Sequence, residues 1–88
     1  MKAEIRLECE NMKKLYGMLE TSVIQGLMGF ASQQRRNMDE TLRRLDDDEL
    51  LEVYNYADKQ EEDYIHIVIE EMEERTIVLG EDGKQIGE

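Results

Sequence analysis

Residues 45–75 read LDDDELLEVYNYADKQEEDYIHIVIEEMEER, which is two helical patterns joined by a short polar connection. Asp46 lies three positions before Glu49, the spacing at which an N-cap side chain and a carboxylate one turn later bond each other's backbone amides. Behind this cap, the apolar residues recur every three or four positions, as they do on one face of a helix. They are Leu50, Leu51, Tyr54 and Ala57.

The second pattern follows the polar break at residues 58–62 and has an apolar stripe of its own, formed by Ile65, Val68, Ile69 and Met72. A connection this short places the two helices side by side and antiparallel. We therefore predict an all-α protein, a small helical bundle with a C-terminal antiparallel helical hairpin. Short terminal β-strands remain an alternative at both chain ends.

The hairpin resembles the Sda family, small inhibitors of the sensor histidine kinases that control sporulation. The resemblance covers 31 of the 88 residues and rests on L-x-D-x-x-L-L-E-x-Y-x-x-A, D-aromatic-I and E-x-x-x-R. Those motifs fall on Leu45, Asp47, Leu50, Leu51, Glu52, Tyr54, Ala57, Asp63, Tyr64, Ile65, Glu71 and Arg75.

This resemblance implies a helical hairpin that blocks the dimerisation and phosphotransfer stalk of a kinase, with Tyr64 on the contact surface. The chain departs from the family pattern in two places. Its inter-helix loop is shorter and carries Gln60, Glu61 and Glu62 where the family has an apolar residue. Glu74 and Arg75 stand where the family has paired basic residues.

Length and composition predict one small domain over residues 1–88: N-terminal helices at 1–45, the acidic hairpin at 46–79 and a tail at 80–88. The single cysteine, Cys9, fits a reducing compartment. The longest apolar run, residues 23–31, is too short for a membrane span. We expect a soluble, cytoplasmic protein.

The charge is strongly negative and unevenly spread. Residues 1–45 hold eight Lys/Arg against six Asp/Glu, and residues 46–88 hold three against sixteen, which gives the net charge of −11. Such a surface repels nucleic acid and anionic membranes, so we expect neither as a direct partner. It suits a larger protein with a basic or helical docking surface. An acidic exterior that only maintains solubility is the alternative.

The N-terminal half has two interpretations. Residues 5–9 alternate as in a short strand, but the apolar positions from Ile5 to Phe30 also fit one long helix, which we favour. Its glycines suggest close helix approach, with a hinge as the alternative.

Residues 31–37 lack an apolar stripe and predict a turn, followed by a short helix around Met38. Four arginines flank that helix and are expected to pair with the acidic hairpin: Arg35, Arg36, Arg43 and Arg44.

Residues 76–79, TIVL, either extend the second helix to a C-terminal cap at Gly80 or form a strand, followed by a turn at residues 81–84 and a returning strand at residues 85–86. If both chain ends are strands, residues 5–7 would pair with residues 77–79. Gly87 and Glu88 are expected to fray.

Catalytic and metal-binding patterns are not found in this sequence. One cysteine and one histidine cannot build an ordinary zinc site, and no phosphate-binding glycine loop is present. His66 lies one step off an apolar stripe, where a boundary histidine is far more common than a catalytic one; it is nevertheless the residue to test for phosphotransfer. We therefore expect no cofactor, no metal and no enzyme activity.

The function that these observations favour is an inhibitor that binds and blocks a larger regulatory protein, with a sensor histidine kinase as the named target. The partner-binding residues are predicted at Tyr54, Tyr56, Tyr64, Asp47, Asp48, Glu52, Glu61, Glu62 and Asp63. The alternative is a phage-type acidic DNA mimic that inhibits a host nuclease, restriction enzyme or CRISPR effector. A homodimer held by residues 23–31 is a further alternative. The partner, the oligomeric state and a host or phage origin stay open.

Overall fold

The computed structural model describes residues 3–79 and 85–86. Within these residues four helices form a bundle, so the all-α prediction is confirmed, and two short strands follow them. The elements are α1 (Ala3–Ile24), α2 (Met28–Arg43), α3 (Asp47–Lys59), α4 (Ile65–Glu74), β1 (Val78–Leu79) and β2 (Gln85–Ile86).

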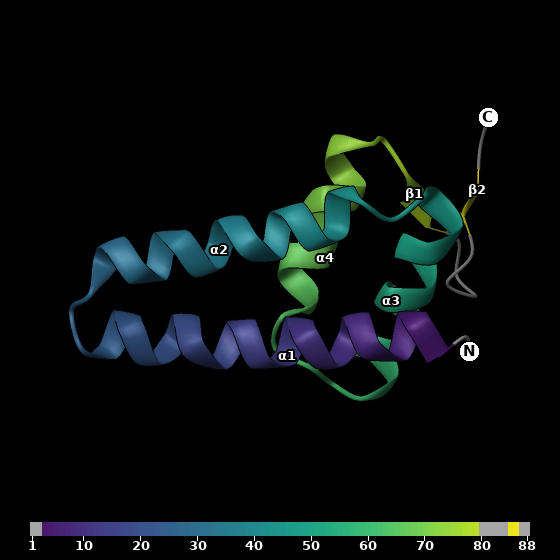
Figure 1. The fold of residues 1–88 in the computed structure, drawn as a ribbon. Helices are drawn as coiled ribbons and strands as arrows, with labels where there is room; N and C mark the ends of the chain where they lie inside the picture. Colours follow the sequence, from purple (N-terminus) through teal and green to yellow (C-terminus); the bar gives the residue numbers. More distant parts are fainter. Residues whose placement is uncertain (1–2, 80–84, 87–88) are drawn as a thin grey trace.

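Helices α1 and α2 lie side by side as a long hairpin, and α3 and α4 pack across one half of it (Figure 1). That half contains the start of α1 and the end of α2. Helices α3 and α4 run in opposite directions, so the predicted C-terminal helical hairpin is confirmed. The other half of the α1–α2 hairpin projects beyond them, and the molecule measures 42 × 25 × 22 Å.

The chain turns at Gly26, where the sequence predicted one continuous helix to Phe30. Gly26 has a φ of +76°, a left-handed conformation that a residue without a Cβ adopts at little cost. The amide of Leu27 then bonds the Ser22 carbonyl at 2.8 Å, and the Gly26 amide bonds that of Val23 at 3.1 Å. The prediction of a turn at residues 31–37 is wrong, because these residues lie inside α2.

Helices α3 and α4 end in the same way, with a left-handed residue that is not glycine. Glu61 has a φ of +55° and Thr76 a φ of +56°. In each case the following amide reaches back to a carbonyl five residues earlier, Glu62 to Ala57 and Ile77 to Met72, both at 2.9 Å. This is the Schellman arrangement, in which the last carbonyls of a helix find donors after it ends. Helix α4 therefore ends at Glu74 and does not extend to residue 79.

The core lies where all four helices meet, and its members are nearly inaccessible to solvent. They are Ile5, Cys9, Met12, Met38, Leu42, Leu45, Leu50, Val53, Ala57, Tyr64, Ile67, Val68, Met72 and Ile77. Two predicted stripes need correction: Val53 and Ile67 are buried although neither was assigned to a stripe, and Ile69 is exposed.

On α1 the predicted apolar stripe is right but its burial is graded. Ile5, Cys9 and Met12 are buried, Tyr16 and Leu19 are half-buried, and Val23 is exposed. The gradient follows the position of α3 and α4, which cover only the first half of α1.

The strand alternative for the C-terminus is confirmed, because β1 pairs with β2 antiparallel, Val78 opposite Ile86. The pairing of residues 5–7 with residues 77–79 is wrong, since residues 5–7 belong to α1. The cap expected at Gly80, the turn expected at residues 81–84 and the fraying expected at Gly87 and Glu88 lie outside the described residues.

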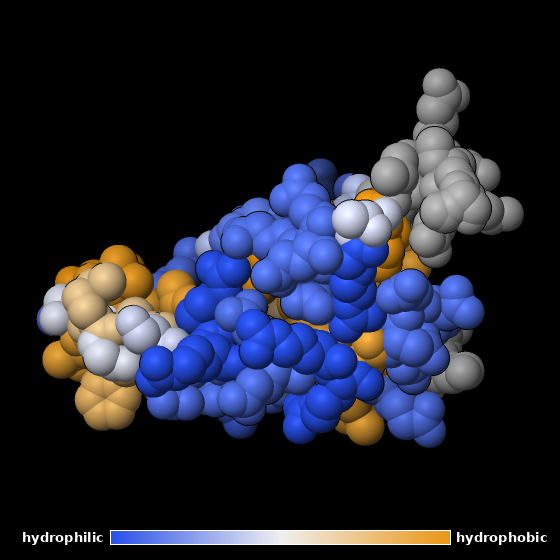
Figure 2. All heavy atoms as spheres, turned by 90° about the horizontal axis from the view of Figure 1, so that it is seen from above, coloured by the Kyte–Doolittle hydropathy of each residue, from blue (hydrophilic) through white to orange (hydrophobic). Residues whose placement is uncertain are grey.

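Close helix approach does not explain Gly17 or Gly29, because no atom of another helix lies within 4 Å of the place a Cβ would occupy at either position. Each described helix is either too short or too polar to cross a bilayer. Figure 2 shows that hydrophobic residues gather at the end of the molecule where α1 turns into α2, while most of the remaining visible face is hydrophilic.

Candidate functional site

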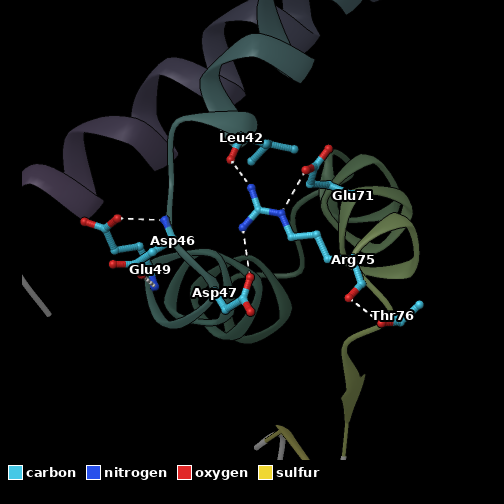
Figure 3. Close-up of polar contacts among 7 residues, drawn as sticks. All are labelled: Leu42, Asp46, Asp47, Glu49, Glu71, Arg75 and Thr76. Carbon is cyan, nitrogen blue, oxygen red and sulfur yellow. Dashed lines mark hydrogen bonds and ion pairs between the residues drawn. The ribbon is translucent and has the colours of Figure 1, made fainter.

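Arg75 joins three helices at the acidic end of the molecule (Figure 3). Its Nε donates to Glu71 Oε2 at 2.9 Å, one turn earlier on α4. One terminal nitrogen donates to Asp47 Oδ1 at 3.2 Å, at the start of α3, and the other donates to the carbonyl of Leu42 at 2.9 Å, near the end of α2. The guanidinium therefore fixes the position of α3 and α4 relative to the first hairpin.

This network uses one carboxylate that was predicted to bind a partner, Asp47, and one that belongs to the E-x-x-x-R motif, Glu71. Glu71 is buried, and its charge is balanced by Arg75. Asp47, predicted to bind a partner, holds the same guanidinium. A buried carboxylate requires such pairing, because desolvation penalises its charged form. Both residues are thus explained by the fold.

The acidic residues at the start of α3 also stabilise the fold. Asp46 Oδ1 accepts from the Glu49 amide at 2.8 Å, and Glu49 Oε1 accepts from the Asp46 amide at 2.9 Å, so the predicted capping box is confirmed (Figure 3). Asp47 and Asp48 stand in the first turn, where the positive end of the helix dipole favours carboxylates.

The carboxylates at the end of α4 have no such explanation. Glu70, Glu73 and Glu74 are exposed, and the last turn of α4 holds no basic residue. Glu73 and Glu74 stand in the last turn, at the negative end of the helix dipole, where a carboxylate is unfavourable by roughly 0.3–1 kcal/mol. We call Glu70, Glu73 and Glu74 the α4 acidic end. The sequence-based list of partner residues omitted them, although the run EEMEER was the signal.

A shallow groove separates the α4 acidic end from α2. Arg35 crosses it, with a terminal nitrogen 2.9 Å from Glu70 Oε1 and its Nε 3.3 Å from Asp39 Oδ1. The predicted pairing of the arginine cluster with the acidic hairpin is therefore found for Arg35. Arg36 instead donates to the Gln33 side chain, and Arg44 lies 3.4 Å from the Thr41 hydroxyl.

The three tyrosines around the hairpin connection do not share one surface. Tyr64 is 1% exposed and lies in the core, so the contact surface that the family resemblance implied for its ring is not available there. Tyr54 and Tyr56 are half-buried against the core. Tyr56 and Glu52 line an open groove between α1 and α3, together with Arg6, Asn55 and Lys59.

The Tyr64 hydroxyl is buried without a hydrogen-bond partner, the one such side-chain atom among the described residues. The Cys9 thiol lies beside it but does not meet hydrogen-bond geometry, and a thiol is a weak donor and acceptor. Burial raises the pKa of the Tyr64 phenol and of the Cys9 thiol, because neither charged form can be solvated there.

The remaining predicted residues lie at the far end of α3 from Asp47 and Asp48, about 20 Å away at 1.5 Å per residue. Glu61 and Asp63 are exposed, and Glu62 is half-buried with its carboxylate 3.8 Å from Lys13 Nζ. The nine predicted residues therefore occupy separate places: the core, the groove beside α1 and both ends of α3.

His66 is exposed at the start of α4. Its Nδ1 lies 2.8 Å from the Asp63 carbonyl, which can only accept, so Nδ1 carries a proton. Its ring meets Tyr16 edge to face, with centroids 5.6 Å apart. Within residues 3–79 and 85–86, the His, Cys, Asp and Glu side chains form no cluster that could hold a metal ion.

Comparison with known proteins gives no relative: no family model matches the chain, and neither a curated protein nor a solved structure matches it.

Proposed function

We propose that this chain is an inhibitory binding protein without catalytic activity, and that its acidic second pair of helices occupies a basic surface of a larger regulatory protein. The observation that carries the proposal is the α4 acidic end, where Glu73 and Glu74 are exposed and the last helical turn holds no basic residue.

Such charges reduce the stability of the helix that carries them, so stability alone does not account for them. An exposed group of like charges raises the rate at which an oppositely charged surface is found, and it disfavours wrong partners. The nearby Arg75 and Arg35 do not neutralise Glu73 and Glu74, because they already bind Glu71, Asp47, Glu70 and Asp39.

A sensor histidine kinase is the target that the resemblance of residues 45–75 to the Sda family implies. The inhibitor would act by occupancy, either obstructing phosphotransfer or preventing a rearrangement of the kinase stalk. Because Tyr64 is buried, the contact in this chain would use the exposed carboxylates of the α4 acidic end.

The test compares two double variants that remove the same charge. Glu73→Gln/Glu74→Gln alters the α4 acidic end, and Glu4→Gln/Glu10→Gln alters two exposed carboxylates on α1. Immobilised wild-type chain and the α1 variant should capture the same partner from a bacterial lysate, and the α4 variant should lose it. If a kinase is captured, its autophosphorylation should fall with wild-type chain and recover with the α4 variant.

The α4 variant should also unfold at a slightly higher denaturant concentration, because two unfavourable charges are gone; a stability gain of about 0.5–1 kcal/mol is expected. If the α4 variant loses binding but gains stability, Glu73 and Glu74 serve a partner surface and not the fold. Equal capture by both variants would contradict the proposal.

The second candidate, a DNA mimic, is favoured by the number of carboxylates on these helices that are exposed to solvent. They are Asp46, Asp47, Asp48, Asp58, Glu61, Asp63, Glu70, Glu73 and Glu74. Binding by a mimic should fall steeply with added salt and compete with duplex DNA. Kinase binding should be unaffected by duplex DNA, so competition by DNA separates the two candidates.

A further inference from the structure

The end of the molecule where α1 turns into α2 is uncharged and apolar. Residues 21–34 contain no Asp, Glu, Lys or Arg, in a chain in which 38% of residues are charged. Large apolar side chains are exposed there, which Figure 2 shows at its left end. They are Val23, Ile24, Leu27, Met28 and Phe30, and we call them the apolar tip.

The apolar tip continues the apolar stripe of α1 past the point where α3 and α4 cover it. The α1 stripe is buried at Cys9 and Met12, half-buried at Leu19 and exposed at Val23, because α3 and α4 cover only the other half of the hairpin. Ile24 is 85% exposed and Phe30 is 63% exposed. Within the described chain, no further helix lies over this end.

The exposed area is large for a small monomer. The exposed fractions of the five tip residues add up to about three whole side chains, which at roughly 150 Å² each, the low end of the range for aromatic side chains, amounts to about 450 Å². That lies within the roughly 300–600 Å² of the largest apolar patch on a typical monomer, which is often functional, and it is more than half of the ~800 Å² that each partner buries in a standard interface.

We propose that the apolar tip is an interface with a second copy of this chain, in a two-fold symmetric dimer of α1–α2 hairpins. A two-fold interface brings the same patch of both copies together, so an uncharged apolar patch complements itself. The interaction needs no charge on the partner, and the tip offers none.

The distribution of charge favours this occupant. Two chains of net charge −11 repel each other wherever their acidic α3–α4 ends meet. Contact through the tips places those ends far apart along molecules that are each 42 Å long, well beyond the ~8 Å screening length at physiological salt. At the rim of the tip, Glu20 on α1 and Arg36 on α2 are both exposed, so opposite charges flank the apolar contact.

The test is sedimentation velocity of the full chain between about 5 and 500 µM. The wild type should shift with concentration toward twice the 10.4 kDa chain mass. Ile24→Glu and Phe30→Glu should each raise the dissociation constant about a hundredfold, since each charge occurs twice in the interface. The matched control is Leu7→Glu, because Leu7 is 62% exposed on the same helix but far from the tip, and it should dimerise as the wild type does.

Circular dichroism of each variant should match the wild type, because every altered side chain is exposed. The Glu73→Gln/Glu74→Gln variant should also dimerise normally, which separates this inference from the proposed function. Added salt should leave the dimer intact or strengthen it, because it screens the repulsion.

Three results would overturn the proposal. A chain that stays monomeric to 500 µM has no such interface. A dimer that Ile24→Glu and Phe30→Glu leave intact uses another surface. A monomer that floats with phosphatidylcholine vesicles, and loses this property in Phe30→Glu, has a lipid-binding tip instead.

Discussion

The Nε of Arg75 lies 2.9 Å from the Oε2 of Glu71, one turn earlier on α4, while its two terminal nitrogens reach Asp47 on α3 and the Leu42 carbonyl on α2. One guanidinium thus balances the charge of the buried Glu71, donates to a carbonyl near the end of α2 and binds a carboxylate at the start of α3. Its planar fork of donors suits this task, since the three acceptors lie in different directions.

Replacing Arg75 by alanine should therefore destabilise the fold severely. Glu71 would stay buried without a counter-charge, and the Leu42 carbonyl would lose its donor. We expect a loss of about 3 kcal/mol in the free energy of unfolding, measured by urea denaturation. Arg75→Lys should recover less than half of it, because one ammonium cannot reach all three acceptors. Arg36→Ala, which removes an exposed arginine bonded to Gln33, is the control and should change stability by less than ~0.5 kcal/mol. A similar effect of both alanine variants would contradict the role given to Arg75.

How much of this could be predicted depends on the distance along the chain over which each interaction acts. The capping box of Asp46 and Glu49 and the two helices of residues 46–75 follow from spacings of three and four residues, so the sequence predicts them. The Glu71–Arg75 pair is also four residues apart, and it is part of the E-x-x-x-R motif. The contacts of Arg75 with Asp47 and Leu42 span 28 and 33 residues, and no local pattern indicates them.

The candidate site was predicted less well for the same reason. The hairpin was expected to present Tyr64, yet its ring is buried in the core beside Cys9 of α1. The turn at Gly26 was missed because the apolar pattern continues through it to Phe30. The pattern continues through the turn because the apolar side chains on either side of Gly26 are exposed on the surface and are not replaced there by polar ones.

Asp46→Ala should cost about 1 kcal/mol of stability, because the Glu49 amide loses its acceptor at the start of α3. Asp46→Asn should retain most of it, since an asparagine oxygen caps a helix nearly as well. Thermal unfolding followed by circular dichroism measures both variants. Equal losses for the two would indicate that the negative charge, rather than the cap, is what matters at this position.

Tyr64→Phe should leave the stability unchanged or raise it by up to about 1 kcal/mol. The hydroxyl is buried and unpartnered, so removing it abolishes a desolvation penalty and breaks no bond. Tyr64→Ala, in contrast, should cost about 3–5 kcal/mol, because the cavity left by the ring opens in the core. Urea denaturation of both variants provides the measurement. A loss above ~1 kcal/mol in Tyr64→Phe would show that the hydroxyl is bonded in solution.

Stability should fall in alkaline solution because the pKa values of Cys9 and Tyr64 are raised in the folded state. The unfolded chain releases these protons at its ordinary pKa values, near 8.5 and 10, and the folded chain retains them. The stabilisation is thus complete below pH ~8.5 and is lost as the pH rises, by up to about 1.4 kcal/mol per pH unit for each group. The free energy of unfolding between pH 7 and 10.5 measures this slope. Tyr64→Phe should flatten it above pH 10, and an unchanged slope would contradict the assignment.

The left-handed residues after α1 and α4 should respond to substitution with opposite signs. Gly26 and Thr76 have the same role in the same hydrogen-bond arrangement, with φ values of +76° and +56°. Gly26→Ala should cost about 1 kcal/mol although nothing lies within 4 Å of the added Cβ, because the penalty arises within the residue itself. Thr76→Gly should gain about 0.5–1 kcal/mol, because a β-branched residue is strained in this conformation and glycine is not.

The control is Gly17→Ala, in the middle of α1 and also in open space, which should gain up to ~1 kcal/mol from helix propensity. A loss in Thr76→Gly would mean that its hydroxyl, which donates to the Arg75 carbonyl at 2.6 Å, stabilises the end of α4 by more than the strain costs.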